Sequence, residues 1–270
     1  MNNADEQNEA YKAGIDAAKK RNYVVAFSLL KPLADKGNPK AQYVIGDFYY
    51  YGNGMMIDYI EARRWYEKAA AADHAKAQFS LGHLHEFGYG VAKNYQKSLD
   101  WYSKAAAQGE RLSQKHIGDL HYHGKGMPEN YAEAASWYLK SADQGYAGAQ
   151  YCLGFMLTLG QGLEKNLNEA FRLFDLAAQQ GHSAAQFELG KRFARGEGVR
   201  RDHDKATEWY IKAAEKGHAQ AQIIVGRLFE RGSHVPKDLS KARLWYKKAL
   251  ENGEKLANTL LSKLPAESNR

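Results

Sequence analysis

The sequence contains a single cysteine, Cys152, and lacks any long apolar segment. One cysteine excludes an intrachain disulfide framework and is typical of a reducing compartment. No apolar run approaches the roughly 18 residues that a bilayer-spanning helix needs. The first seven residues are polar and lack the apolar core of a secretory signal. We therefore expect no membrane span and a cytoplasmic protein, or a periplasmic or secreted one if a signal peptide precedes this chain.

Tryptophan is absent outside one recurring position. All five tryptophans belong to Trp-Tyr pairs that follow a 36-residue period, and Leu173-Phe174 replaces the pair in one copy. The pairs are Trp65-Tyr66, Trp101-Tyr102, Trp137-Tyr138, Trp209-Tyr210 and Trp245-Tyr246. A fixed period of this size indicates a solenoid, in which each repeat packs on its neighbours without one central core.

Glycine recurs inside the first helix predicted for each copy, which we call helix A. The six positions are Gly46, Gly82, Gly118, Gly154, Gly190 and Gly226. A glycine in a helix interior costs about 1 kcal/mol relative to alanine, so six in one slot predict the close approach of a neighbouring helix backbone. A later glycine, followed in five copies by a second one, ends helix A. We interpret this Gly-x-Gly as an interhelical turn, because a phosphate-binding loop would follow a strand.

Aspartate or asparagine precedes the second helix of each copy, helix B. These residues are Asp58, Asn94, Asn130, Asn166, Asp202 and Asp238. Both residue types are preferred N-caps, so we interpret these acids as helix caps and not as catalytic carboxylates. Helix B then places apolar residues at i, i+3, i+4 and i+7, which is typical of one buried face.

The period predicts an all-α solenoid of helix-turn-helix repeats. Residues 1–9 are expected to be a disordered tail, and residues 10–37 a degenerate capping repeat. Six regular repeats follow over residues 38–256. Residues 257–264 are expected to form a C-terminal capping helix, and residues 265–270 a loose tail.

The copies share Ala-x-Ala-Gln-x-x-Leu-Gly, then Gly-x-Gly-Val, then Asp-x-x-Lys-Ala-x-x-Trp-Tyr-x-Lys-Ala-Ala-x-x-Gly. This pattern closely resembles the Sel-one-like repeat (SLR) family over about residues 38–256. The resemblance implies a right-handed α/α superhelical solenoid and an adaptor that binds proteins. Tetratricopeptide repeats, with a period of 34, rank second. Some cysteine-rich bacterial members are linked to β-lactam or peptidoglycan binding, but they use a disulfide in each repeat, and this chain has one cysteine.

One stripe of helix A faces away from the packing side at 100° per residue. If helix A lines the concave surface, as the resemblance implies, this stripe is the partner-binding groove. Its candidate residues in the first half are Asp47, Tyr51, His83, Phe87, Asp119 and His123. Its candidates in the second half are Lys191, Arg195, Arg227 and Arg231, with Arg192 at the flank.

The positive charge is concentrated near the C-terminus. Residues 1–184 carry 20 basic and 20 acidic residues, whereas residues 185–270 carry 18 and 11, so the whole excess of +7 lies there. Like charges four residues apart on one helix repel one another, and the repetition one period later predicts an anionic ligand. We expect an acidic or phosphorylated segment of a protein or peptide. A nucleic-acid groove should be basic along its length, which makes that alternative weaker.

A catalytic or metal site is not expected. His116, Asp119, His123 and Cys152 are acceptable zinc ligand types, but Cys152 belongs to the next repeat, whose helix axis is expected about 8–10 Å away. We expect no metal and no cofactor. No serine recurs beside a histidine in a strained turn, and no insertion between repeats offers room for an active site. The sequence thus favours a non-catalytic scaffold, with a peptidoglycan- or β-lactam-binding or -hydrolysing protein as the alternative.

Overall fold

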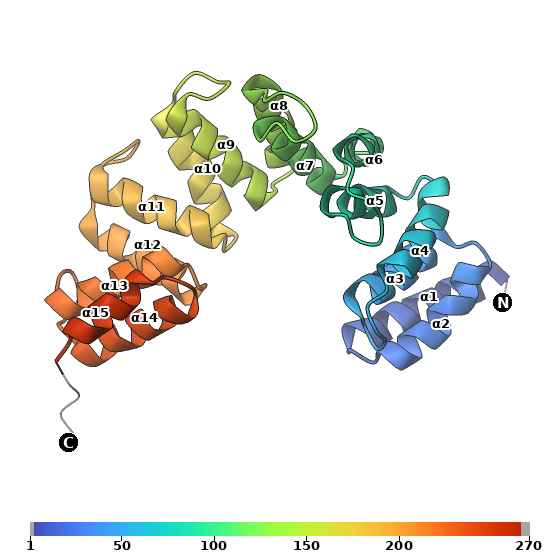
Figure 1. Ribbon diagram of the computed structural model, residues 1–270, viewed down its shortest axis with the longest axis horizontal. Helices are drawn as coiled ribbons and strands as arrows, with labels where there is room; N and C mark the ends of the chain where they lie inside the picture. Colours follow the sequence, from blue (N-terminus) through green and yellow to red (C-terminus); the bar gives the residue numbers. More distant parts are fainter. Residues whose placement is uncertain (1–2, 266–270) are drawn as a thin grey trace. The chain divides into compact units, whose positions relative to one another are not determined.

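The computed structural model describes residues 3–265, and the regular structure in that range is entirely α-helical (Figure 1). Its helices are α1 (Asn3–Lys19), α2 (Tyr23–Asp35), α3 (Pro39–Tyr51), α4 (Tyr59–Ala71), α5 (Ala75–Phe87), α6 (Tyr95–Ala107), α7 (Arg111–Tyr122), α8 (Tyr131–Asp143), α9 (Ala147–Leu159), α10 (Leu167–Gln179), α11 (Ser183–Arg195), α12 (His203–Glu215), α13 (Ala219–Arg231), α14 (Leu239–Glu251) and α15 (Leu256–Lys263). Helices α3, α5, α7, α9, α11 and α13 are the predicted A helices.

The chain divides into two compact units, residues 1–137 and 138–270, which we call unit 1 and unit 2. In unit 1, consecutive helices from α1 to α7 pack on each other, the last such pair being α6 and α7. In unit 2, the same holds from α9 to α15. Nearest-neighbour packing of this kind defines a solenoid, so the predicted all-α repeat fold is confirmed.

The glycine inside helix A makes room for an aromatic ring of helix B. A Cβ atom on Gly46 would lie 2.5 Å from Cε1 of Tyr66, but 3.3 Å from the nearest backbone atom, the carbonyl oxygen of Ala62. Where phenylalanine replaces the tyrosine, a Cβ on Gly154 would lie 3.2 Å from the ring of Phe174. The predicted close approach is therefore present, but the nearest neighbour is the tyrosine ring and not the helix backbone.

The predicted caps and turns are present. All six Asp or Asn side chains accept a hydrogen bond from a backbone N–H in the first turn of helix B. The turn glycines have positive φ, for example 67° at Gly52 and 64° at Gly90. A Cβ on Gly90 would also lie 2.7 Å from the carbonyl carbon of Tyr59, so both conformation and space require glycine there. His234 occupies this position in the last repeat with φ 59°.

The N-terminal segment differs from its prediction. Helix α1 begins at Asn3, so residues 3–9 are helical where the sequence predicts a disordered tail. Tyr11 and Ile15, further along the same helix, pack on the buried cluster formed with α2 and α3. Asp5 and Glu6 lie in its first turn, where acidic side chains complement the helix dipole. Residues 1–2 lie outside the described residues.

The two ends of the solenoid are helical. Helices α1 and α2 form the pair over the predicted degenerate repeat 10–37, and they pack on each other as later pairs do. The predicted capping helix 257–264 corresponds to α15, which packs on α14. Of the predicted loose tail, only Pro265 lies within the described residues.

Candidate partner-binding surfaces

Each A helix leaves two slots open, directly after its internal glycine and four residues further on. In unit 1 these slots hold Asp47, Tyr51, His83, Phe87, Asp119 and His123. In unit 2 they hold Phe155, Leu159, Lys191, Arg195, Arg227 and Arg231. All twelve side chains are partly or fully exposed. The residues that recur from repeat to repeat thus pack between helices, whereas the residues in the open slots differ between repeats and stay accessible to solvent.

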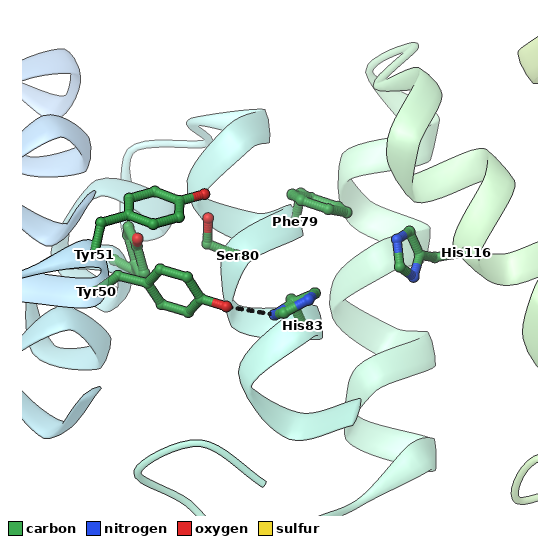
Figure 2. A pocket seen from close by; sticks show the side chains of 7 residues that line it. Tyr50, Tyr51, Phe79, Ser80, His83 and His116 are labelled. Atoms are coloured by element: carbon green, nitrogen blue, oxygen red, sulfur yellow. Dashed lines mark hydrogen bonds between the residues drawn. The ribbon is translucent and has the colours of Figure 1, made fainter. Parts of the chain in front are cut away.

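Unit 1 contains a cavity of about 220 Å³ with a mainly aromatic lining. Its lining residues are Tyr50, Tyr51, Tyr66, Phe79, Ser80, His83 and His116. Figure 2 shows the residues that α3, α5 and α7 contribute, with the hydroxyl of Tyr50 hydrogen-bonded to Nδ1 of His83 at 3.2 Å. Burial lowers the pKa of His83, and the neighbouring His116 lowers it further, so His83 is neutral at neutral pH.

Asp47 adjoins one wall of this cavity. The hydroxyl of Tyr66, a lining residue, donates to Oδ1 of Asp47 at 2.7 Å. Asp47 is half-buried and forms no ion pair with any residue between 3 and 265. Burial raises the pKa of its carboxyl to about 6, against the opposing effect of hydrogen bonds from Tyr66 and Tyr43. The carboxylate is therefore held in a poorly solvated place without a cation.

Glu86 is a second acid of unit 1, and the sequence reasoning missed it. Its carboxylate is buried and accepts from the hydroxyl of Tyr102 at 2.9 Å, from Nδ1 of His116 at 3.0 Å and from Nζ of Lys125 at 3.2 Å. Burial by itself raises the pKa of Glu86, but these hydrogen bonds outweigh it and bring the pKa to about 2. The available signal was the spacing, because Glu230 lies equally 16 residues before a Tyr of the repeated pair and accepts from Tyr246 at 2.6 Å.

Exposed aromatic side chains continue from the cavity onto the surface. Tyr51 and Phe87 are 64% and 43% exposed. Phe87 lies against His83, with ring centroids 4.5 Å apart. Tyr89, which the sequence reasoning did not single out, stacks on Tyr59 at 4.9 Å and lies 5.9 Å from Phe87. The structure therefore brings the predicted residues Tyr51, His83 and Phe87 into one aromatic area.

The other two predicted residues of unit 1 are differently placed. Asp119 forms an ion pair with Lys115 at 2.6 Å, one turn earlier on α7. His123 is exposed at the C-terminal end of α7 and makes an edge contact with Tyr122. Asp119 thus differs from Asp47, which occupies the same slot two repeats earlier without an ion-pair partner.

Unit 2 presents basic residues in the same slots. Lys191 pairs with Glu188 at 2.7 Å, and Arg195 lies 3.5 Å from Glu197. These two contacts correct the sequence expectation that the cations are uncompensated. Both pairs are partly exposed to solvent, so each stabilises the fold by no more than about 1 kcal/mol.

Arg227 and Arg231 remain without such compensation. Neither forms an ion pair with a residue that the structure describes. The nearby carboxylate of Glu230 is bound to the hydroxyl of Tyr246 instead. Arg231 is exposed at the end of α13, and Arg227 is partly exposed one turn earlier.

Arg192 does not belong to the surface. Only 1% of the residue is exposed, and its guanidinium lies 4.6 Å from the ring of Phe174. Nη2 donates to Oγ1 of Thr158 at 2.5 Å, whereas Nε and Nη1 are buried without a hydrogen bond, and Nη1 lies 3.8 Å from a carboxylate oxygen of Glu197. The prediction that Arg192 contacts a partner is therefore wrong. Arg192 follows Lys191 directly and therefore points 100° away from it around the helix. This position is apolar in other repeats, as at Met156.

Residues 3–265 offer neither a metal-binding cluster nor a membrane-spanning helix. Within this range, no group of three or more His, Cys, Asp or Glu side chains is arranged to hold a metal ion. In the same range, no helix is both long enough and apolar enough to cross a membrane.

Comparison with protein families identifies the repeat. The Sel1 repeat matches residues 9–38, 39–74, 75–110, 112–146, 147–182, 183–218 and 219–254. The chain belongs to the Sel1 repeat family. The first match covers the α1–α2 pair, so the segment predicted as a degenerate cap is also a Sel1 repeat by sequence.

Solved structures of Sel1 repeat proteins are similar to this chain. A Sel1 repeat protein from Oxalobacter formigenes is 33% identical, with a TM-score of 0.79 over 89% of this chain and 96% of the other. A protective antigen of uropathogenic Escherichia coli with an SLR fold is 34% identical, with a TM-score of 0.75 over 94% of this chain. The match spans only 56% of that antigen's length.

More distant structures share the fold alone. An immunity protein from Pseudomonas aeruginosa is 22% identical, with a TM-score of 0.52 over 82% of this chain and 88% of its own length. No curated protein matches the sequence.

The Sel1 framework explains which residues are available for binding. In five of the Sel1 repeats, the glycine of helix A and the aromatic residue of helix B are occupied by their mutual contact, as at Gly46 and Tyr66. The two open slots of helix A are not part of that contact, and their chemistry changes from mainly acidic and aromatic in unit 1 to apolar on α9 and basic on α11 and α13 in unit 2. These slots are therefore the candidate partner-binding surfaces.

Proposed function

We propose that this protein is a non-catalytic scaffold that binds a protein or peptide partner along the open slots of its A helices. Sel1 repeat proteins are typically protein-interaction scaffolds, which supports the general part of this proposal. The binding surface supports it further, because accessible aromatic and charged side chains are enriched where proteins recognise each other.

The partner presents an acidic or phosphorylated segment to unit 2. The observation that carries this assignment is the pair Arg227 and Arg231, which lie one turn apart without an ion-pair partner among the described residues. Arg195 lies in the same slot as Arg231, one repeat earlier, and its side chain is 62% exposed. A guanidinium offers two parallel donors to a carboxylate or phosphate, so three accessible arginines suit a short anionic segment.

Lys191 and Arg195 contribute less than Arg227 and Arg231. Glu188 and Glu197 already hold them in partly exposed ion pairs. An anionic ligand must compete with these carboxylates, whereas it meets no such competitor at Arg227 and Arg231.

The test compares charge reversal at the open slots of α13 with charge reversal elsewhere on the surface of unit 2. The double variant Arg227→Glu/Arg231→Glu is measured against a panel of acidic, phosphorylated and neutral peptides. The control, Lys216→Glu/Lys247→Glu, makes the same change in net charge at two exposed lysines of the helix B side. We expect the stripe variant to weaken binding of anionic peptides at least about tenfold, and the control to remain within about twofold of the parent.

Salt provides an independent reading of the same interaction. Binding through exposed charges should weaken as ionic strength rises and the screening length shortens. Equal binding by the stripe variant and the parent, or binding that does not change with salt, would show that these arginines are only a solvated surface.

A further inference from the structure

Two acidic residues of unit 1 have opposite surroundings. Glu86 is buried but receives hydrogen bonds from His116, Tyr102 and Lys125, so its charge is compensated inside the protein. Asp47 is half-buried and receives hydrogen bonds only from tyrosine hydroxyls. A partly desolvated carboxylate without a cation is costly to the fold, and a cation supplied from outside would remove that cost.

No cation of the protein fills this role. Lys76 on α5 acts on Asp47 through space, but it forms no ion pair with Asp47 among residues 3–265. Asp119 occupies the equivalent slot two repeats later, and there Lys115 pairs with it at 2.6 Å. An aspartate in this slot therefore has a lysine ion-pair partner in one repeat, at Asp119, and has none among the described residues in another, at Asp47.

The cavity beside Asp47 suits a flat cation. Its walls carry the rings of Tyr50, Tyr51 and Phe79, and aromatic faces attract cations. Ser80 and the hydroxyls of Tyr50 and Tyr66 add hydrogen-bond acceptors. The lining holds no lysine or arginine that would repel a positive charge, and the imidazole of His116 in the lining is paired with the carboxylate of Glu86 at 3.0 Å.

We propose that this cavity binds the guanidinium of an arginine side chain from the protein partner, with Asp47 as the counter-ion. The inference rests on the proposed scaffold function and names a second contact for the same partner. Arginine fits better than lysine, because a planar guanidinium stacks on aromatic rings and offers five donors. A volume of about 220 Å³ is smaller than the roughly 300 Å³ at which pockets for drug-sized ligands begin, and it suits one side chain.

The surroundings favour an arginine within a polypeptide over a free small molecule. Tyr51, Phe87 and Tyr89 are exposed next to the cavity. Their rings offer apolar contacts to the residues that flank the inserted side chain, and aromatic residues are enriched in the centre of protein interfaces. A free guanidinium compound would leave this exposed aromatic area uncovered.

The experiment uses short blocked peptides as probes of the full chain. Acetyl-Gly-Arg-Gly-amide is compared with its citrulline and lysine analogues and with free argininamide. Binding is followed by NMR through the ring protons of His83 and His116, which lie in the cavity lining. We expect the arginine peptide to shift both sets of signals, and the neutral citrulline peptide to bind at least about tenfold more weakly.

Three variants show which side chains contribute to binding of the arginine peptide. Asp47→Asn removes the charge but keeps the shape and an acceptor for Tyr66, and it should weaken the arginine peptide at least about tenfold. Tyr51→Ala removes an exposed ring and should weaken it about three- to fivefold. Asp119→Asn makes the same chemical change in the equivalent, already paired slot and should leave binding within about twofold. Melting curves check that each variant is folded.

Each contrary result has a defined meaning. Equal binding of the citrulline peptide, or unchanged binding by Asp47→Asn, would overturn the cation site. Equal binding of lysine would overturn the preference for guanidinium, and equal binding of free argininamide would overturn the assignment to a partner's side chain. The variant Arg227→Glu/Arg231→Glu should retain arginine binding, so failure of the cavity and failure of the acidic-segment proposal give separate results.

Discussion

The two units use the same helical framework to present opposite chemistry. In unit 1 the open slots hold Tyr51 and His83, which line an aromatic cavity, and Asp47, which accepts a hydrogen bond from the lining residue Tyr66. In unit 2 they hold arginines such as Arg195 and Arg231. The packing residues of both units are nearly the same, since a glycine of helix A receives an aromatic ring of helix B in each. The repeat therefore sets where each open slot lies on the surface, and the residue in the slot sets which partner chemistry it can recognise.

The largest expected effect tests the shared framework. Gly82→Leu should destabilise the protein by at least about 3 kcal/mol, because even a Cβ would lie 2.5 Å from the ring of Tyr102. Gly154→Leu is the matched change in unit 2, where the first contact, with Phe174, is at 3.2 Å. Urea unfolding should show a smaller loss for Gly154→Leu. Equal losses would mean that the ring contact does not explain the glycine.

An intermediate effect concerns Asp47 and pH. The titratable groups that act on it are Tyr43, Tyr50 and Tyr51 on α3, Tyr66 on α4 and Lys76 on α5. The folded pKa of about 6 lies above the ordinary 3.8, so the native state binds the proton more tightly than the unfolded state does. The carboxyl therefore supports folding fully below pH 3.8, and this support is lost as pH rises through about 6.

Asp47→Asn should consequently be more stable than the parent at pH 7.5, by up to about 2 kcal/mol after allowance for partial exposure. The advantage should shrink as pH falls and disappear near pH 4, where the parent carboxyl is protonated. Unfolding curves at both pH values measure this difference. An advantage of the same size at both values would contradict the role given to the Asp47 charge.

The smallest expected effect lies in unit 2 at Arg192. Its guanidinium is buried with two nitrogen atoms that form no hydrogen bond, one of them 3.8 Å from Glu197, in the slot that Met156 fills one repeat earlier. Arg192→Met should stabilise the fold by about 1 kcal/mol, since an apolar side chain of similar length loses no hydrogen bonds to water. Arg195→Met, at an exposed position, should change stability by less than about 0.5 kcal/mol. Thermal melting compares the two, and destabilisation by Arg192→Met would show that the buried charge supports the fold.

The architecture follows from the pattern of the repeats. The 36-residue period and the recurring Trp-Tyr pair predicted the helix pairs, and the six Asp or Asn residues predicted the starts of the B helices, as confirmed at Asp58 and Asn94. These features are local, because a cap or a turn depends on residues only a few positions apart. The open slots also followed from helical periodicity, but Arg192, which was predicted at their flank, is buried.

Which charged residues are compensated depends on the packing between helices and cannot be read from the repeat pattern. Asp47 and Asp119 look alike in the repeat, but only Asp119 has an ion-pair partner in the described structure. Glu86 is buried under His116 and Lys125, which are 30 and 39 residues away in the sequence. Solvation and pairing depend on contacts between repeats, where small differences in side-chain direction decide whether a charge meets a partner, a ring or water. Periodicity places a residue on a face, but the neighbouring helix sets its environment.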